Sequence, residues 1–357
     1  MKTPSELGFR MPAEWEPHSA TWIAWPHNRT DWPGKGLMVE WVFVEIARHV
    51  SRTERVRILV GTQKQEQRAE RMLARSGVDL TRVDFVRRST NRSWTRDYLP
   101  SFVTRRARSR REVAAVKWRF NGWARYDDFA QDEKTGAAVA KWLGARTFRP
   151  TLGKRRVVLE GGAIDVDGQG TLLATEQCLL SGPFARNREL GRAGTEKTLS
   201  EHLGTTRVVW LGDGIAGDDT SGHVDDFVRF VAPGRVVVCS EKNRRDENYA
   251  PLAAAKERLT GARDARNRKL EVIELPMPEP VAFAGQRLPA SYANFYFSNG
   301  TLLVPTFGDP ADRVALGILS ELFPKRRVVG VYCRDLVLGL GTLHCSTQQE
   351  PAGVVLR

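Results

Sequence analysis

Short runs of β-branched and aromatic residues alternate with amphipathic helical stretches along the whole chain, and this alternation constrains the fold more than any other feature. Strands are predicted at 19–25, 55–60, 113–120, 156–166, 170–175, 207–211, 223–231, 235–240, 291–298 and 301–306. Helices are predicted near 38–51, 64–76, 132–144, 194–203, 249–261 and 310–323. We therefore expect an α/β protein.

The helix predicted at 310–323 has the clearest boundaries. Asp309 suits the N-cap, Pro310 fits the first helical position, and Pro324 ends the helix. Its apolar residues form one stripe: Ala315, Leu316, Leu319, Leu322 and Phe323.

The domain organisation and location follow from composition. Of 357 residues, 41% are hydrophobic and 27% are charged, as in ordinary globular proteins. No linker rich in proline, glycine or serine divides the chain, so a single domain over 1–357 is predicted. The sequence contains no apolar run of about 18 residues and no signal-peptide core, so we expect no membrane contact and a cytoplasmic location.

Cysteine usage and charge bear on metal binding and on nucleic-acid binding. The four cysteines are scattered without zinc-ligand spacing, so we expect free thiols and no metal site. The net charge of +13 raises nucleic-acid binding as an alternative. The basic clusters are dispersed and no nucleic-acid-binding motif accompanies them. No specific nucleic-acid partner is therefore expected, and a non-catalytic basic nucleic-acid-binding protein is the most distant alternative.

A cysteine near the C-terminus follows two closely spaced glycines. Gly339 and Gly341 allow a tight turn or a close approach of the backbone to a ligand. Cys345 is the candidate nucleophile, although a buried, inert cysteine is the commoner role for this residue type. If residues 343–346 are extended, His344 and Cys345 point to opposite faces, so His344 is not expected to be the base.

Three further segments place acids and a histidine in distinctive settings. In a strand, His223 and Asp225 would share a face, which suits proton transfer beside a cation. Asp97 lies among aromatic residues, and Glu160 precedes two glycines. Each segment also has a structural alternative. Asp97 pairs with Arg96 or caps a turn, and Glu160 accepts hydrogen bonds from backbone N–H groups. The segment with His223 and Asp225 is a strand end with a surface carboxylate.

Together the four segments resemble the guanidine-modifying superfamily, whose sites combine an RD acid, an EGG acid, an HxD pair and a C-terminal HC nucleophile. They occur here in the family's order, as Arg96-Asp97, Glu160-Gly161-Gly162, His223-Val224-Asp225 and His344-Cys345. More specifically, the chain is similar to the agmatine deiminases and bacterial, porphyromonas-type peptidylarginine deiminases over roughly 11–352. Further motifs carry this similarity, at 11–18, 21–26, 120–128, 168–175 and 291–296.

The resemblance implies a five-bladed pseudosymmetric α/β propeller of ββαβ units around a central site. It implies a hydrolase that takes a small guanidinium substrate and needs no cofactor or metal. The reaction that the resemblance favours is the hydrolysis of agmatine to N-carbamoylputrescine and ammonia, in putrescine synthesis. The alternatives are peptidyl or free arginine giving citrulline, and an amidinotransferase-like reaction in which an amine resolves the intermediate. A homo-oligomer is left open.

The resemblance also implies roles for single residues. Cys345 would attack the central carbon, and His223 would protonate the departing nitrogen and then activate water. Asp97 and Asp225 would clamp the planar cation, with Glu160 assisting. Substrate contacts are also expected from Trp94, Arg96, Gly341 and Ser221. Because the three acids oppose thiolate formation, Cys345 should react slowly with neutral alkylating agents and faster with a haloacetamidine.

Four positions depart from the family pattern. Members usually carry an acid where this chain has Arg92, and Asp where it has Ser221. Leu99 and Leu340 replace glycines. Losing two acids is expected to weaken recognition of agmatine's free amine, which leaves agmatine and arginine derivatives open as substrates.

Overall fold

A computed structural model describes residues 2–108 and 110–356. The single domain predicted over 1–357 therefore has its first and last residues, Met1 and Arg357, outside the described residues. Over the described part, no helix is both long and apolar enough to cross a bilayer.

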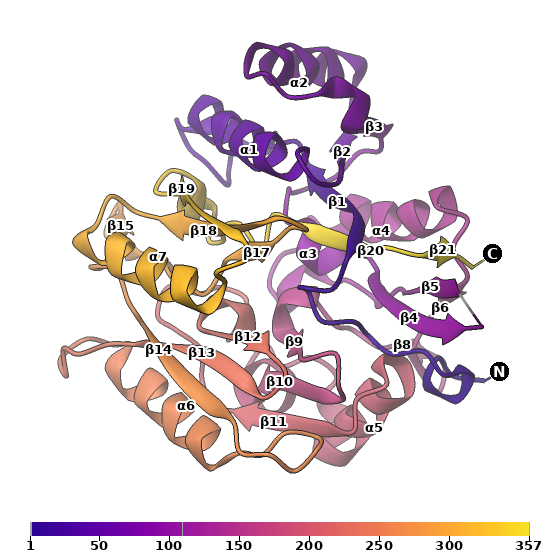
Figure 1. Ribbon diagram of the computed structural model, residues 1–357, viewed down its shortest axis with the longest axis vertical. Helices are drawn as coiled ribbons and strands as arrows, with labels where there is room; N and C mark the ends of the chain where they lie inside the picture. The colour runs from indigo at the N-terminus through magenta and orange to yellow at the C-terminus, as the bar shows by residue number, and fades with distance from the viewer. Residues whose placement is uncertain (1, 109, 357) are drawn as a thin grey trace.

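The described part of the chain contains five sheets of three or more strands (Figure 1). The first has the order β20 (Gln348–Pro351), β1 (His18–Ala24), β2 (Arg55–Val60) and β3 (Val83–Arg87). The second has the order β21 (Val354–Val355), β5 (Arg110–Val116) and β4 (Ser101–Ala107), with β6 (Thr147–Phe148) paired to β5.

The other three sheets repeat one pattern, in which the first two strands are antiparallel and the third is parallel to the second. The third sheet contains β9 (Ile164–Val166), β10 (Thr171–Thr175) and β11 (Arg207–Leu211). The fourth contains β12 (Val228–Ala232), β13 (Arg235–Ser240) and β14 (Glu271–Pro276). The fifth contains β17 (Tyr296–Phe297), β18 (Thr301–Thr306) and β19 (Arg327–Tyr332). Two small hairpins, β7–β8 (Thr151–Leu152, Arg155–Arg156) and β15–β16 (Ala282–Phe283, Gln286–Arg287), lie outside them.

Six parallel pairs join strands that follow one another in the chain, and each of these pairs is connected through a helix; β21, which lies parallel to β5, is separated from it by most of the chain. The crossover helices are α1 (Gly36–Val50), α2 (Gln63–Arg75), α4 (Ala130–Trp142), α5 (Gly191–Leu203), α6 (Tyr249–Gly261) and α7 (Pro310–Leu322). They lie around the outside of the molecule, with the strands toward its middle (Figure 1). The predicted α/β class is confirmed.

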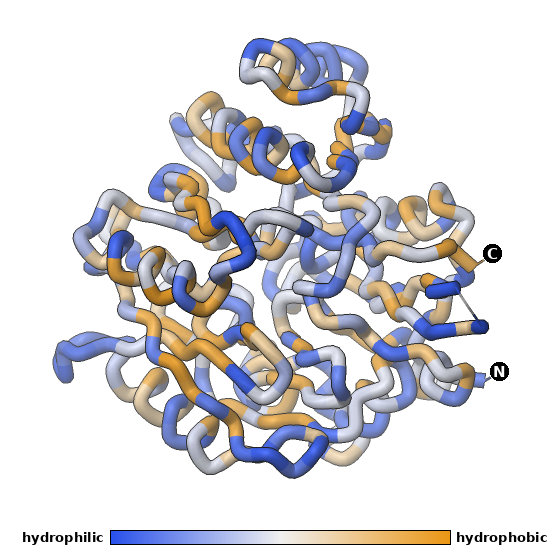
Figure 2. The backbone as a smooth tube through the Cα atoms, viewed as in Figure 1, coloured by the Kyte–Doolittle hydropathy of each residue, from blue (hydrophilic) through white to orange (hydrophobic). Residues whose placement is uncertain are grey.

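Apolar residues concentrate on the strands and on the helix faces that cover them (Figure 2). The fourth sheet shows the reason: Val236, Val237 and Val238 are all fully buried in the same apolar cluster as Leu252 of α6. Burying one such side chain stabilises the fold by about 1.5–3 kcal/mol. The C-terminal segment is held by strand pairing, because β20 pairs with β1 and β21 pairs with β5.

The predicted elements agree best where strands are regular. The bounds of β2, β11, β13, β18 and α6 are those predicted, and Asp309 caps α7 with a capping box. Four predicted strands are wrong in part: 113–120 ends at Val116, 156–166 is interrupted after residue 156 and resumes at Ile164, 223–231 starts only at Val228, and 291–298 is reduced to β17. In the second and third of these, the backbone leaves the extended form where it carries the candidate residues Glu160 and His223.

Candidate active site

Five segments, each just before an edge strand of one of the five sheets, converge on one place. They are α3 (Thr95–Tyr98) before β4, residues 160–163 before β9, residues 223–226 before β12, residues 291–295 before β17, and residues 342–347 before β20. The short helix α3 contacts the 3₁₀ turn η4 (Gly161–Ala163), which contacts the turn η7 (Val224–Asp226). The sheets thus hold the segments in place, while the segments themselves are irregular.

The structure brings the histidine and all three predicted acids together. The Nδ1 atom of His223 lies 3.9 Å from Oδ1 of Asp97 and 4.0 Å from Oδ1 of Asp225. Its Nε2 atom lies 3.8 Å from Oε2 of Glu160. Asp97 is held by two donors, Nε1 of Trp123 at 2.9 Å and the backbone N–H of Gly162 at 3.0 Å.

The thiol of Cys345 joins this cluster through Asp225. Its Sγ atom lies 3.7 Å from Oδ2 of Asp225, and the residue is 6% exposed. Residues 343–346 form a turn instead of the extended segment considered above. The expectation that His344 lies on the opposite face is therefore wrong: its Nδ1 lies 2.6 Å from Oδ2 of Asp225, and its Nε2 lies 2.7 Å from Oε2 of Glu14.

Burial and neighbouring charge shift the pKa values of these groups in different directions. Burial, together with Asp225 and the other nearby aspartates, raises the pKa of Cys345 well above its ordinary value. Burial would lower the pKa of His223. Asp97, Cys178 and Glu160 outweigh burial and hold the pKa of His223 well above its ordinary value. Burial raises the pKa of Asp97 to about 6 even though His223 opposes the shift. The empty site thus favours a neutral thiol beside a protonated imidazole.

A buried ion pair fixes Glu160. Its Oε1 accepts a hydrogen bond of 3.1 Å from Nε of Arg186, and both side chains are fully buried. Burial opposes ionisation of Glu160, but Arg186 and His223 outweigh it and lower its pKa. The carboxylate is therefore charged, with its Oε2 atom directed toward the imidazole.

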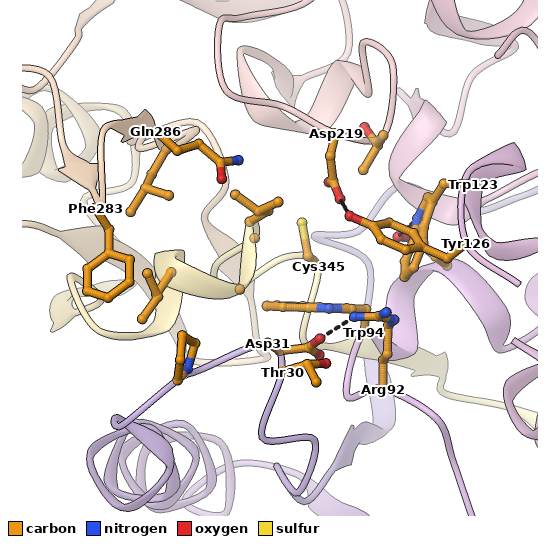
Figure 3. Close-up of a pocket in the computed structure, with 18 of the residues that line it drawn as sticks. Thr30, Asp31, Arg92, Trp94, Trp123, Tyr126, Asp219, Phe283, Gln286 and Cys345 are labelled. Atoms are coloured by element: carbon orange, nitrogen blue, oxygen red, sulfur yellow. Dashed lines mark hydrogen bonds and ion pairs between the residues drawn. The ribbon is translucent and has the colours of Figure 1, made fainter. Parts of the chain in front are cut away.

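A cavity of about 410 Å³ opens onto the cluster (Figure 3). Cys345, Asp97, Trp94 and Gly341, which were all expected at the site, line this cavity. Gly341 allows a close approach, because a Cβ there would lie 3.0 Å from the ring of Trp94 and 3.3 Å from the sulfur of Cys345.

Charged side chains and a tyrosine also line this cavity, and Figure 3 shows Asp31, Arg92, Tyr126 and Asp219 among them. Arg92 forms an ion pair with Asp31, donates to Asp128 at 3.1 Å, and stacks 4.5 Å from the centre of the Tyr126 ring. Asp219 accepts a hydrogen bond from the Tyr126 hydroxyl. Burial raises the pKa of Asp31 to about 7 and that of Asp219 to about 6.

Two predicted substrate contacts are not among the cavity-lining residues. Arg96 is buried, and its guanidinium donates to Oε1 of Gln349 at 2.6 Å and to Oε2 of Glu14 at 3.0 Å. Ser221 occupies a left-handed backbone position, with φ of 71°, in the turn before His223. In the structure, Arg96 ties the segment that follows Cys345 to the N-terminal segment, and Ser221 shapes a turn; their contact with substrate stays a prediction.

Several residues of the cluster were not predicted from the sequence. Glu14, Trp123 and Asn294 lie within the motifs that carry the family resemblance, but no property of the isolated residues indicated their roles. Arg186 had no signal at all. A buried acid such as Glu14, 5% exposed, is identifiable only when its partners His344 and Arg96 are known.

Two groups of side chains have donor atoms within 4.8 Å of one another, as a metal site would require: Glu160, Cys178 and His223, and Asp225, Asp226 and Cys345. Each group includes members of the acid, imidazole and thiol cluster. A cationic organic group suits the same donors, since carboxylates accept paired N–H bonds from a planar guanidinium.

Comparisons with known proteins agree with this geometry. A model of the family described as Porphyromonas-type peptidyl-arginine deiminase matches residues 10–351. The agmatine deiminase of Ectopseudomonas mendocina is 37% identical and covers 98% of this chain and 97% of its own. The solved agmatine deiminase of Enterococcus faecalis has a TM-score of 0.90 and 34% identity over 98% of both chains. A substrate-bound Cys-to-Ser variant of C. jejuni agmatine deiminase has a TM-score of 0.85 and 26% identity over 97% of both chains.

Proposed function

The chain belongs to the Porphyromonas-type peptidyl-arginine deiminase family, and from this premise we propose that it hydrolyses the guanidinium group of agmatine to N-carbamoylputrescine and ammonia. The observation that carries the proposal is the chain of contacts of 4.0 Å or less that joins Cys345, Asp225, His223, Asp97 and Glu160. These residues come from four separate segments, and together they supply a nucleophile, a proton donor and three acids.

The cluster holds unsatisfied acceptors of the kind a guanidinium needs. In the described part of the chain, Oε2 of Glu160 and Oδ1 of Asp225 are buried without a hydrogen-bond partner. A buried polar atom without a partner costs about 1–3 kcal/mol, more if it is charged. A bound guanidinium relieves that cost, because its N–H groups fan out in one plane toward carboxylates on either side.

The reaction follows from the protonation states. Binding the cation offsets the negative charge around Cys345, so the thiol loses its proton to solvent and the thiolate attacks the central carbon. Protonated His223 gives its proton to one nitrogen, the C–N bond breaks, and ammonia leaves an amidino-cysteine. His223, now neutral, takes a proton from the attacking water. The C–S bond then breaks, releasing the ureido product and the thiolate, while the second water proton leaves to solvent.

The charged residues that line the cavity, Asp31, Arg92 and Asp219, favour a substrate with a cationic tail. We expected Arg92 to weaken recognition of an amine, but its charge is offset by Asp31 and Asp128. Asp219 adds a further acid, and Oδ2 of Asp31 lacks a partner among the described residues. The acids therefore outnumber the arginine, and a cation bound beside them would favour the charged forms of Asp31 and Asp219, whose pKa values are raised by burial. This balance suits the ammonium group of agmatine better than the α-carboxylate of free arginine.

The finer points of architecture and location are part of the proposal. Five sheets, each preceded by a segment that reaches the site, support a five-bladed ββαβ propeller closed by the β20–β1 pairing. We also propose that the chain is a single domain and that it acts in the cytoplasm, where its unpaired cysteines would stay reduced.

Ammonia release from agmatine, free arginine and an arginine peptide with blocked ends tests the proposal. Agmatine should give the highest kcat/KM, Cys345→Ser should release no ammonia, and Cys333→Ala, which changes a buried thiol outside the cluster, should stay active. A preference for arginine or the peptide would overturn the substrate assignment. Salt-sensitive DNA binding that persists in Cys345→Ser, with no ammonia from any guanidine, would favour a nucleic-acid-binding protein.

A further inference from the structure

We propose that Asn294 is a further catalytic residue of this site. Its amide nitrogen stabilises the thiolate that Cys345 forms when the cationic substrate binds, and its amide oxygen fixes the turn that carries this sulfur. The inference rests on the proposed role of Cys345 as the nucleophile. Asn294 lies just before β17, is 1% exposed, and is 51 residues from Cys345 in the sequence.

The orientation of the amide is settled by the donors around its oxygen. The Oδ1 atom accepts from Oγ1 of Thr342 at 2.8 Å, from the backbone N–H of His344 at 3.0 Å and from that of Cys345 at 3.4 Å. A flipped amide would place its NH₂ group against two backbone donors, which cannot accept hydrogen bonds. The nitrogen must therefore face the other way, toward the sulfur and the acids.

The amide nitrogen has more acceptors than hydrogens. Its Nδ2 atom lies 3.1 Å from Oδ1 of Asp226, 3.2 Å from Sγ of Cys345 and 3.3 Å from Oδ2 of Asp225. The backbone oxygen of Asp225 is a further acceptor at 3.5 Å, so two hydrogens are shared among four acceptors, and the contact to the sulfur is one of the two shortest. Among the described residues, Asn294 is the only group found donating to this sulfur.

The surrounding charge explains why a neutral donor suits this position. Asp225, Asp226 and Asp97 all oppose the thiolate, so a donor is needed to hold it. A lysine or arginine here would hold the thiolate but repel the guanidinium cation that must bind beside it. An amide stabilises the sulfur anion without cancelling the negative field that attracts the substrate.

The pH profile of Cys345 alkylation by chloroacetamidine tests the role, with the modified residue identified by mass spectrometry. In Asn294→Ala the sulfur loses its donor, so half-maximal labelling should move up by about one to two pH units. At pH 7, kcat/KM for agmatine should fall roughly 10- to 100-fold. Asn294→Asp keeps the oxygen that fixes the turn and loses the donor, so its profile should also move up.

Thr342→Val is the matched control. It removes one bond to Oδ1 but leaves the NH₂ group, so its profile should move by less than half the shift seen in Asn294→Ala. If folded Asn294→Ala labels with the wild-type profile, the inference is overturned. Should that variant fail to fold, a wild-type profile in Asn294→Asp overturns it. Wild-type protein whose Cys345 does not label, with ammonia release surviving Cys345→Ser, would instead refute the proposed function.

Discussion

A single methyl group at position 162 is the sharpest test of the site geometry. Gly162 lies between the groups that would hold the guanidinium, and a Cβ there would lie 2.5 Å from Nδ1 of His223, 3.0 Å from Oδ1 of Asp97 and 3.1 Å from Oδ1 of Asp225. Its backbone is not left-handed, so alanine brings crowding without backbone strain. Gly162→Ala therefore perturbs the position of the catalytic groups and leaves their chemistry intact.

The size of the effect follows from these distances. Ordinary contact begins near 3.4 Å, so the imidazole must move by roughly 1 Å. A displacement of about 1 Å can cost on the order of 100-fold in rate, which is about 2.7 kcal/mol of transition-state stabilisation. Overpacking should also lower the free energy of unfolding by about 1–3 kcal/mol.

Steady-state ammonia release, combined with urea unfolding, separates these two effects. Gly212→Ala is the control, because a Cβ there meets only the guanidinium of Arg258, at 3.7 Å. It should match the wild type in both measurements. Gly162→Ala that folds and keeps the wild-type kcat/KM would refute the placement of the guanidinium between His223, Asp97 and Asp225.

Three further predictions address stability and pH. A Cβ at Gly161 would lie 2.3 Å from the backbone oxygen of Arg96, which cannot rotate away, so Gly161→Ala should lower the unfolding free energy by about 3 kcal/mol in urea titration. Because the pKa of Asp97 is raised to about 6, kcat/KM should rise as pH increases through 6. The raised pKa also contributes to the free energy of unfolding. That contribution is complete below the unfolded pKa of Asp97, near 3.8, and is lost as pH rises through 6. Arg186→Met leaves the carboxylate of Glu160 buried without its partner and should cost about 3–5 kcal/mol by thermal unfolding.

Specific outcomes would contradict each of these. Wild-type stability in Gly161→Ala would mean that the backbone near residue 96 can shift. A flat kcat/KM between pH 5 and 7 would place the ionisation of Asp97 outside that range. An Arg186→Met variant as stable as the wild type would show that Glu160 takes up a proton when its partner is removed.

The regular part of the fold could be predicted because its periodicity is local. The strand at 235–240 and the helix at 249–261 were located to the residue, since a buried apolar run and a helical stripe are visible in one window of sequence. The strands at 83–87, 101–107, 271–276, 327–332 and 348–351 were missed, and each lies at one edge of its sheet. Those at 83–87, 271–276 and 327–332 are partly exposed, so their apolar pattern is weaker.

The site segments could not be placed in this way, because they are where the chain departs from regular structure. His223 and Asp225 were expected to meet as alternate residues of a strand. They do meet, but across a 3₁₀ turn, in which strand periodicity does not apply. The reasoning about His344 failed for the same cause: a turn replaces the extended segment, and the imidazole joins the cluster.

The four motifs taken together singled out Cys345, His223 and the three acids, whereas Asn294 and Glu14 gain meaning only from the atoms that the fold places beside them. Those atoms explain how one pocket can suppress a thiol and still use it. Burial and the nearby aspartates keep Cys345 protonated in the empty site, and the same acids attract a cation. In the proposed mechanism, a neutral reagent therefore meets a thiol, while a bound guanidinium favours the thiolate that attacks it. Selectivity for cations and protection of the free cysteine would then have a single electrostatic origin.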